Sequence, residues 1–140
     1  MWGAGKVAAG RKAGETGAWG EDLAVAHLCA KGYHLVARNW RRPCDRRDEL
    51  DLVFRDRELT VFVEVKTRRA GGLVRGMLAL NGRKQLVLRR AIRAWLELQQ
   101  GRVRHFRFDV VEIEYGPGRS VAREGILHVR NYPLFRTRLF

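Results

Sequence analysis

The sequence has few cysteines and no long hydrophobic run, and each of these shortages excludes a class of protein. Its two cysteines, Cys29 and Cys44, have neither a zinc-binding nor a redox spacing, and its four histidines are scattered without a pair at ligand spacing. No stretch is apolar enough to span a membrane, and no internal repeat occurs. No secretory segment precedes the cysteines. We therefore expect reduced thiols, a cytoplasmic location and no membrane partner.

The length predicts one domain. A chain of 140 residues that is 46% hydrophobic can form one real core and is too short for two comfortable domains. Residues 1–16 are rich in glycine and alanine, carry three basic side chains and lack an apolar period. A flexible basic arm is expected there, either trailing along nucleic acid or forming an ordinary disordered terminus. Residues 17–140 are expected to form the folded domain.

The charge is strongly one-sided. There are 28 basic and 15 acidic residues, a formal charge of +13, and only five of the basic residues are lysine. Such an excess attracts polyanions, and the planar guanidinium group of arginine suits phosphate. Nucleic acid is the expected partner. An anionic membrane surface and a plain solvated basic face are the alternatives.

Residues 49–66 have the pattern of a β-hairpin. Two apolar, β-branched runs flank the charged segment 55–58, which is typical of two strands joined by a tight turn. A turn centred between Arg57 and Glu58 pairs residues whose numbers have the same sum. The predicted pairs are Arg55 with Thr60, Val53 with Phe62, Asp51 with Glu64, and Glu49 with Lys66. One side then consists of apolar residues alone, namely Leu50, Leu52, Phe54, Val61, Val63 and Val65.

The far end of this hairpin gathers acids. Asp51 facing Glu64 is destabilising unless a cation compensates, and Lys66 neutralises only part of the charge. Oxygen ligands of this kind suit Mg²⁺, which commonly binds through one or two carboxylates and retains waters. The alternative is an exposed edge hairpin with a salt-bridge cluster. The apolar character of both strand faces argues against that alternative.

Several motifs together resemble a known family. They are Gly17-Ala18-Trp19-Gly20-Glu21, Gly32-Tyr33, Arg38-Asn39-Trp40-Arg41, Glu49-Leu50-Asp51-Leu52-Val53, Phe62-Val63-Glu64-Val65-Lys66-Thr67-Arg68 and Arg107-Phe108-Asp109-Val110-Val111. Asp51 followed by Glu64-Val65-Lys66 is similar to the PD-(D/E)XK nuclease motif. The ordered set resembles the YraN-like family of small bacterial proteins, which are similar to Holliday junction resolvases. The resemblance runs from about Gly17 to Tyr132.

The resemblance implies a fold and a chemistry. The fold would be α/β and restriction-endonuclease-like, with a mixed central sheet flanked by helices. The activity would be phosphodiester hydrolysis with Mg²⁺ or Mn²⁺, on branched or structured DNA more than on RNA, by an enzyme expected to work as a homodimer. The catalytic residues would be Asp51, Glu64 and Lys66. The metal ligands would be Asp51, Glu64, the Val65 carbonyl, Glu21 and Glu49.

The remaining elements would place basic residues around this pocket. Helices are predicted over residues 18–31 and from Asn81 to Gln100, and further strands over 33–40, 102–115 and 126–132. Asp109 is expected to be a structural partner of an arginine. Asp48, where the family usually has glycine, would alter a turn or add a surface charge. Helix residues Arg83, Arg89, Arg90 and Arg93 are expected on an outer face.

Seven basic residues are predicted to contact phosphate. They are Arg41, Arg42, Arg46 and Arg47 in a basic loop, Arg68 and Arg69 before a glycine-rich segment, and Lys84 on the second helix. A solvated charge run would look the same. Two other functions also fit: a non-catalytic nucleic-acid-binding protein on a nuclease-like scaffold, and an assembly factor of a nucleic-acid machine.

Overall fold

The computed structural model describes residues 13–71, 80–122 and 125–135. Most of the predicted basic arm, the irregular segment after Gly71 and the arginine-containing tail lie outside these ranges. The elements in chain order are α1 (Ala13–Ala30), β1 (His34–Arg42), β2 (Asp45–Asp56), β3 (Leu59–Arg69), α2 (Gly82–Leu98), β4 (Phe106–Tyr115), the short 3-10 helix η1 (Pro117–Arg119) and β5 (Ile126–Val129).

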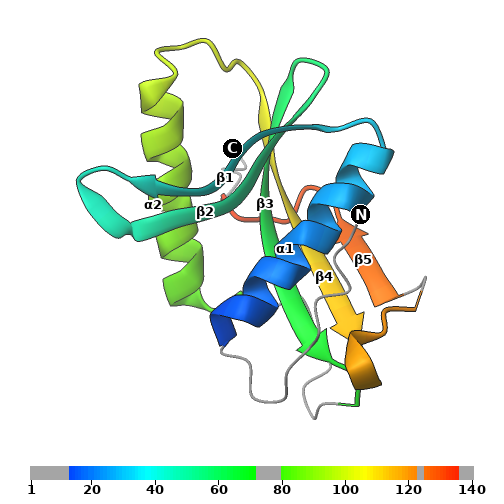
Figure 1. The fold of residues 1–140 in the computed structure, drawn as a ribbon. Coiled ribbons are helices and arrows are strands. Elements are labelled where there is room, and N and C mark those ends of the chain that lie inside the picture. The colour runs from blue at the N-terminus through cyan, green and yellow to red at the C-terminus, as the bar shows by residue number, and fades with distance from the viewer. Residues whose placement is uncertain (1–12, 72–79, 123–124, 136–140) are drawn as a thin grey trace.

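The strands form one mixed sheet in the order β1-β2-β3-β4-β5 (Figure 1). Neighbouring strands are antiparallel, except that β3 and β4 run parallel. A parallel pair needs a crossover connection, and α2 supplies it. The predicted α/β fold with a mixed sheet flanked by helices is confirmed.

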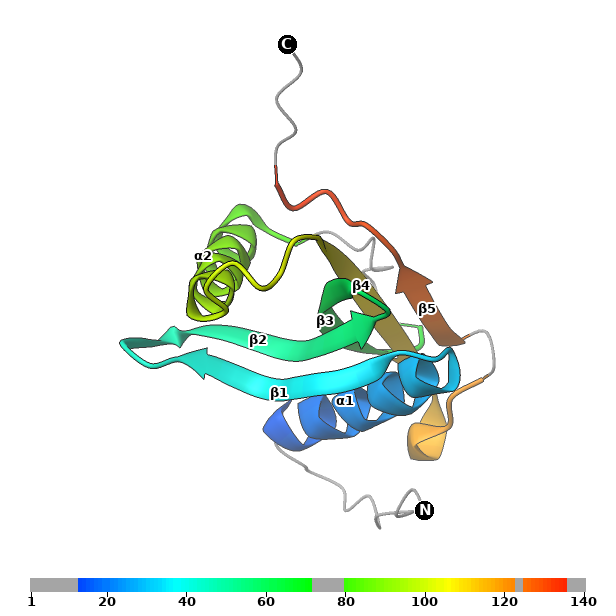
Figure 2. The same cartoon turned by 90° about the horizontal axis from the view of Figure 1, so that it is seen from above.

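The two helices cover opposite faces of the sheet, as Figure 2 shows from above. The core on the α1 face consists of Ala24, Leu28, Tyr33, Leu52, Phe54, Val61, Val63, Val111 and Ile113. The core on the α2 face consists of Leu50, Val53, Phe62, Leu80, Leu88, Ala91, Ile92, Phe108, Val110 and Leu134. The sheet is therefore buried on both sides. Neither helix in the described part of the chain is long and apolar enough to cross a lipid bilayer.

Helix α1 ends where the sequence predicts and begins earlier. Gly32 has a φ of +95°, and the Tyr33 N–H donates to the Leu28 carbonyl at 3.1 Å, which closes the helix with a glycine in the left-handed region. The start at Ala13 differs from the predicted start at Ala18. Residues 13–16, predicted as part of the arm, are helical.

The prediction of a basic loop at residues 41–47 is wrong. Strand β1 continues to Arg42 and β2 already begins at Asp45, so only Pro43 and Cys44 form the turn. The arginines of this segment therefore lie on a β-hairpin that extends beyond the body of the sheet beside α2 (Figures 1 and 2). A run of charges looked like a loop because both faces of this hairpin tip carry polar side chains.

The predicted register of β2 and β3 is confirmed near the turn and wrong at its far end. Arg55 pairs with Thr60 and Val53 with Phe62, and over the described strands the ladder ends at Leu52 and Val63. Beyond that point the Asp51 side chain, through Oδ2, accepts the Val65 N–H at 3.0 Å. A carboxylate thus takes the place of a backbone partner, and the strands separate at the position predicted to pair Asp51 with Glu64.

Leu50 lies on the other face from the one predicted. It packs with Val53 and Phe62 on the α2 face, whereas Leu52 and Phe54 pack beneath α1. Strand β2 therefore rotates between Leu50 and Leu52. Strict alternation along a strand, the basis of the prediction, does not hold through a local twist of this kind.

Helix α2 has the predicted cap. The Asn81 side chain accepts the Lys84 backbone N–H through Oδ1 at 2.8 Å. Strands β4 and β5 are shorter than predicted, spanning Phe106–Tyr115 and Ile126–Val129.

Candidate active site

The candidate site lies where β2 and β3 separate. Asp51 comes from β2, and Glu64 and Val65 come from β3. Glu64 is 4% exposed, and glutamate is rarely buried to this extent unless it has a charged partner. The two carboxylates are within hydrogen-bonding distance of each other.

Burial and the proximity of the two carboxylates favour the protonated form of Asp51. Burial, together with the hydrogen bond and negative charge of Glu64, raises the pKa of Asp51 to about 8, despite the N–H that Val65 donates. Two adjacent acids in a poorly solvated site cannot both ionise freely. The pair therefore holds a proton at neutral pH when no further cation is present.

A lysine from α2 reaches this pair. Lys84 Nζ lies 3.1 Å from Glu64 Oε2. Burial opposes the charged ammonium, but the charge and hydrogen bond of Glu64, with Asp51 and Glu49 behind it, raise the pKa of Lys84 above its usual value. Lys84, assigned by the sequence to phosphate contact, is thus a direct partner of the candidate catalytic glutamate.

Lys66 lies at the edge of the same site. Burial, and next the charge of Arg68, lower the pKa of Lys66, while Glu64 and Glu112 act in the opposite direction. Arg68 itself pairs with Glu112 at 3.6 Å. The two lysines therefore differ: Lys84 is held by Glu64, whereas the surroundings of Lys66 favour release of its proton.

Helix α1 brings a third acid close. A Cβ on Gly20 would overlap Oγ1 of Thr67, so the helix approaches β3 as closely as glycine permits. This approach brings Glu21 near the site. Burial, and next the negative charge of Asp51, raise the pKa of Glu21. Arg38 Nε holds the same carboxylate at 3.3 Å.

The other predicted ligands lie less directly on the site. Glu49 pairs with Arg41 at 3.6 Å near the surface, although its charge reaches Lys84. Val65 contributes its N–H to Asp51, and its carbonyl as a ligand stays a prediction. Within the ranges that the structure describes, no three His, Cys, Asp or Glu side chains are close enough together to hold a metal ion. The site is therefore a pair of carboxylates with Glu21 and Glu49 further out.

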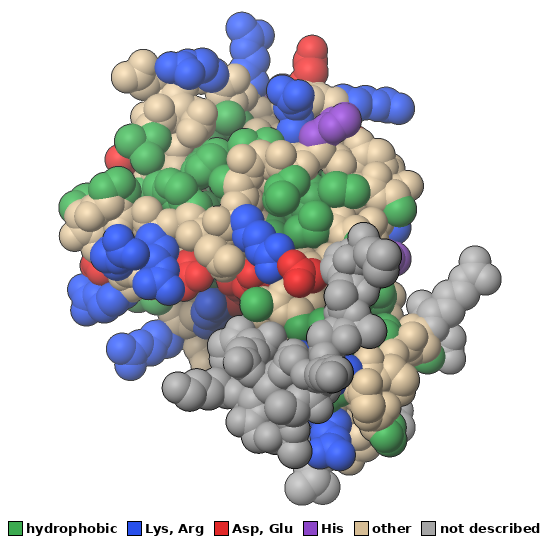
Figure 3. Space-filling view, viewed as in Figure 1, with side chains coloured by type: hydrophobic (Ala, Val, Ile, Leu, Met, Phe, Trp, Pro, Cys, Tyr) green, Lys and Arg blue, Asp and Glu red, His purple; other side chains and the backbone are tan. Residues whose placement is uncertain are grey.

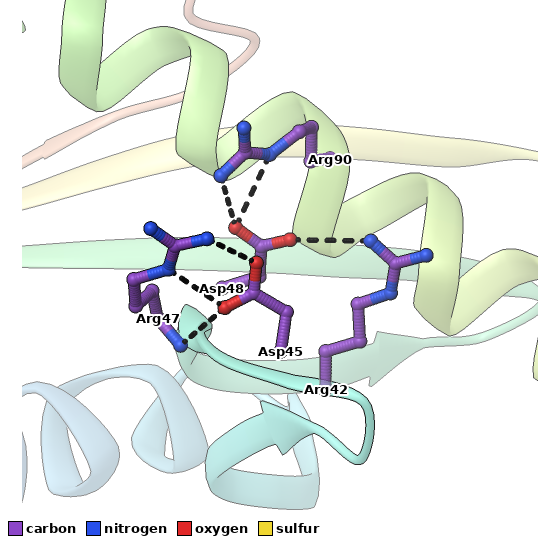
Figure 4. Close-up of polar contacts among 5 residues, drawn as sticks. All are labelled: Arg42, Asp45, Arg47, Asp48 and Arg90. Carbon is purple, nitrogen blue, oxygen red and sulfur yellow. Dashed lines mark hydrogen bonds and ion pairs between the residues drawn. The ribbon is translucent and has the colours of Figure 1, made fainter.

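The sequence prediction missed the environment of Asp48, three residues before Asp51. It is fully buried, and Figure 4 shows its carboxylate between Arg42 of β1 and Arg90 of α2. The expectation that Arg90 lines an outer face is wrong, and Asp48 is neither a turn residue nor a surface charge. One signal was available: Asp48 is two residues before Leu50 on a strand, and such residues share a face.

The remaining arginines surround the site unevenly. Figure 3 shows basic side chains gathered over the β1–β2 hairpin, with acidic side chains beside them. Arg47 pairs with Asp45 at 2.9 Å, and the Arg47 side chain is 83% exposed. Arg46 and Arg69 are exposed as well.

Away from the site, Asp109 is buried and accepts from Arg107 at 2.7 Å, as the sequence predicts. Asp109 also contacts His128 at 2.8 Å.

Comparison with known proteins identifies the family. The model of the family described as "Uncharacterised protein family UPF0102" matches residues 20–113. A UPF0102 protein of Nocardia farcinica is 46% identical over 102 residues, covering 73% of this chain and 78% of the relative. One from Rhodococcus opacus is 39% identical over 115 residues, covering 82% of this chain and 92% of the relative. The matched region contains Glu21, Asp51, Glu64, Lys66 and Lys84. The chain belongs to the UPF0102 family, which is the YraN-like family that its motifs resemble.

Proposed function

We propose that this protein is a metal-dependent endonuclease that hydrolyses phosphodiester bonds in nucleic acid, in DNA more than in RNA. The observation that carries the proposal is the Asp51–Glu64 pair, in which Glu64 is buried and Asp51 is half-buried, with Lys84 Nζ at 3.1 Å from Glu64. A surface made only for binding phosphate gains little from carboxylates, because they repel the ligand. A site that positions a cation and water beside phosphate needs them.

The donor set fits a divalent cation of the magnesium type. Mg²⁺ is bound through one or two carboxylates and keeps several waters, so Asp51 and Glu64 suffice without a third acid. Burial and the adjacent Glu64 raise the pKa of Asp51, and a bound cation would offset both effects. Bound metal would polarise the phosphate and lower the pKa of a coordinated water. Metal binding is expected to release the proton that the pair holds.

The surrounding side chains have distinct roles in this proposal. Lys84 orients Glu64 and adds a positive charge that stabilises the negative charge developing on phosphate. Lys66, whose pKa is lowered, orients the attacking water or takes part in proton transfer. Glu21 contacts the site through water. Branched or structured DNA as the substrate follows from the resemblance to resolvases.

A second function is supported by one observation. Lys84 Nζ pairs with Glu64 at 3.1 Å, and a carboxylate paired in this way can serve structure alone. On this reading the basic surface binds nucleic acid and the acids hold α2 against β3.

The test is cleavage of labelled linear, flap and four-way-junction DNA and of structured RNA, with Mg²⁺, Mn²⁺ or chelator, while binding is recorded in the same reactions. Glu64→Gln and Asp51→Asn are expected to lower the cleavage rate by roughly 100-fold or more and to leave binding in place. Glu114→Gln is the matched control, because Glu114 is an exposed glutamate on β4.

A second readout follows the metal without relying on activity. Titration of Mn²⁺ followed by its EPR signal is expected to show binding to the wild type that Asp51→Asn removes. Tight nucleic-acid binding with no cleavage in any metal would replace the nuclease proposal by the binding-scaffold function.

A further inference from the structure

We propose that Asp48, Arg42 and Arg90 form a second phosphate-binding site, which holds the nucleic-acid backbone beside the candidate active site. We call these three residues the Asp48 clamp. The inference rests on the proposed function, because it assigns the clamp to the same substrate. It adds a requirement: the substrate is a strand that continues for at least one or two nucleotides beyond the scissile phosphate.

The buried carboxylate of Asp48, on β2, links Arg42 of β1 to Arg90 of α2. Arg90 donates to Asp48 Oδ1 through Nη2 at 2.7 Å and through Nε at 3.2 Å. Arg42 donates to Oδ2 through Nη1 at 3.4 Å. Figure 4 shows the two guanidinium groups approaching the carboxylate from different sides.

Exposure is divided unequally within the clamp. The Asp48 side chain is 0% exposed, whereas the Arg42 and Arg90 side chains are 35% and 40% exposed. An anion that approaches from solvent can reach the guanidinium groups and cannot reach the carboxylate. Each guanidinium carries five N–H groups, and Asp48 occupies one from Arg42 and two from Arg90. The clamp therefore has a net positive charge and turns it outward.

The arginines are held in place before any ligand binds. A free arginine loses side-chain entropy when it grips phosphate, and a guanidinium already fixed by a carboxylate loses less. Beside the clamp, Asp45 fixes Arg47 in the same way, accepting from Arg47 Nε at 3.0 Å and Nη2 at 2.9 Å. The hairpin tip thus presents several arginines whose orientation is set in advance.

Tethering the hairpin to α2 does not by itself account for two arginines. Trp40 of β1 already packs against Trp95 of α2, with ring centroids 5.5 Å apart. One arginine neutralises one carboxylate, and the second leaves a surplus of positive charge at the surface. A surplus beside an acidic site is what a polyanionic substrate requires.

The position of the clamp gives its distance from the reaction. Asp48 is three residues before Asp51 on the same strand, which corresponds to about 10 Å. Successive phosphates of one strand rise by about 3.4 Å along a duplex and lie further apart than that in space, because the strand also winds around the axis. The clamp would therefore hold a phosphate roughly one to two nucleotides from the scissile one.

The experiment compares two substrates of the same enzyme. Bis(p-nitrophenyl) phosphate has one phosphodiester and no neighbouring phosphate, whereas a labelled DNA strand of about 20 nucleotides reaches the clamp. The variants are Arg90→Gln and the double variant Asp48→Asn/Arg90→Gln, in which neutral amides can replace the ion pair. The control is Arg102→Gln, since Arg102 is exposed and lies beyond the C-terminal end of α2, twelve residues after Arg90.

The clamp variants are expected to lower kcat/KM on the DNA strand by about 10-fold and to leave the small phosphodiester within about 2-fold of wild type. The control is expected to change neither. Equal losses on both substrates would overturn the proposal, since the clamp would then only support the site. No loss on either substrate would overturn it as well.

Equilibrium binding tests the clamp independently of catalysis. The slope of log Kd against log salt for the labelled strand is expected to be smaller by about 0.7 to 0.9 in Arg90→Gln than in the wild type. This measurement applies even if no variant cleaves DNA, so failure of the nuclease proposal and failure of the clamp can be told apart. An unchanged slope and affinity would exclude the clamp as a phosphate site.

Discussion

At the scale of single residues, the buried carboxylates divide into two kinds. Asp48 and Asp109 are fully buried, and each is compensated by arginine. Lys84 pairs with Glu64 at 3.1 Å, and burial with the hydrogen bond and negative charge of Glu64 raises the pKa of Asp51. A buried charge that lacks a partner destabilises a fold. Despite burial, hydrogen bonds from His128 and Arg107 lower the pKa of Asp109, whereas the pKa of Asp51 is raised. This difference distinguishes the candidate active site from the Asp109 cluster.

The proton held by the Asp51 pair predicts how stability depends on pH. Asp51 has a pKa of about 8 in the folded chain and an ordinary value of 3.8. Between these values the unfolded chain has lost the proton and the folded chain keeps it, so the free energy of unfolding falls as pH rises. The slope is at most about 1.4 kcal/mol per pH unit. Asp51→Asn removes this dependence.

Urea unfolding in chelator from about pH 5 to about pH 8 measures the effect. We expect the free energy of unfolding of Asp51→Asn to exceed that of the wild type by roughly 1 to 3 kcal/mol as the pH approaches about 8. Glu114→Gln should follow the wild type. If the free energies of unfolding of wild type and Asp51→Asn change in parallel with pH across this range, the prediction is contradicted.

At the scale of elements, the contact between α1 and β3 depends on one glycine. A Cβ at Gly20 would overlap Thr67, whereas a Cβ at Gly17 would have nothing within 4 Å. Gly20→Ala is expected to lower the free energy of unfolding by about 1 to 3 kcal/mol, because α1 must move away from the sheet. It should also move Glu21 away from Asp51.

Thermal and urea unfolding of three variants check this contact. Gly17→Ala, on the same helix, should be neutral or stabilising by up to about 1 kcal/mol. Gly20→Ala/Thr67→Ala should recover part of the loss, since it removes the overlapping hydroxyl. Equal stability of Gly20→Ala and Gly17→Ala would show that the close approach has no energetic consequence.

The start of α2 positions Lys84, so its cap links stability to the site. Asn81→Ala is expected to cost about 1 kcal/mol of unfolding free energy, because the Lys84 N–H loses its acceptor. Fraying of this turn would also release Lys84 from Glu64. Asn81→Ser keeps a capping oxygen and should behave like the wild type in urea unfolding. If the serine variant loses as much stability as the alanine variant, the cap is not the source of the effect.

At the scale of the whole molecule, the charge of +13 predicts salt-sensitive binding of polyanions. The affinity for a labelled DNA strand should fall linearly on a log–log plot as salt rises, with a slope of magnitude about 3 or more. Fluorescence anisotropy over a salt series measures it, and Glu64→Gln should give the same slope. An affinity that does not change with salt concentration would contradict an electrostatic origin of DNA binding. The expected homodimer stays a prediction, to be decided by sedimentation equilibrium.

Much of the fold could be predicted because its signals are local. The β2–β3 turn, the Gly32 stop of α1 and the Asn81 cap of α2 each depend on residues a few positions apart. The apolar alternation of residues 61–65 assigned that part of β3 to the correct faces. The errors occurred where a local rule met a tertiary contact: the twist at Leu50, the separation of the strands at Asp51, and the hairpin taken for a loop at 41–47.

The sequence by itself determined the family, the two candidate acids and the basic character of the chain, because composition and motif spacing are properties of the chain alone. Only the tertiary structure decided how the charges are compensated. Arg90 and Lys84 lie on the same helix, yet Arg90 meets Asp48 and Lys84 meets Glu64. Residues 20 to 42 positions apart become partners because α2 crosses the face of the sheet, and no local pattern records that crossing. The physical reason is that electrostatic compensation depends on distance in space.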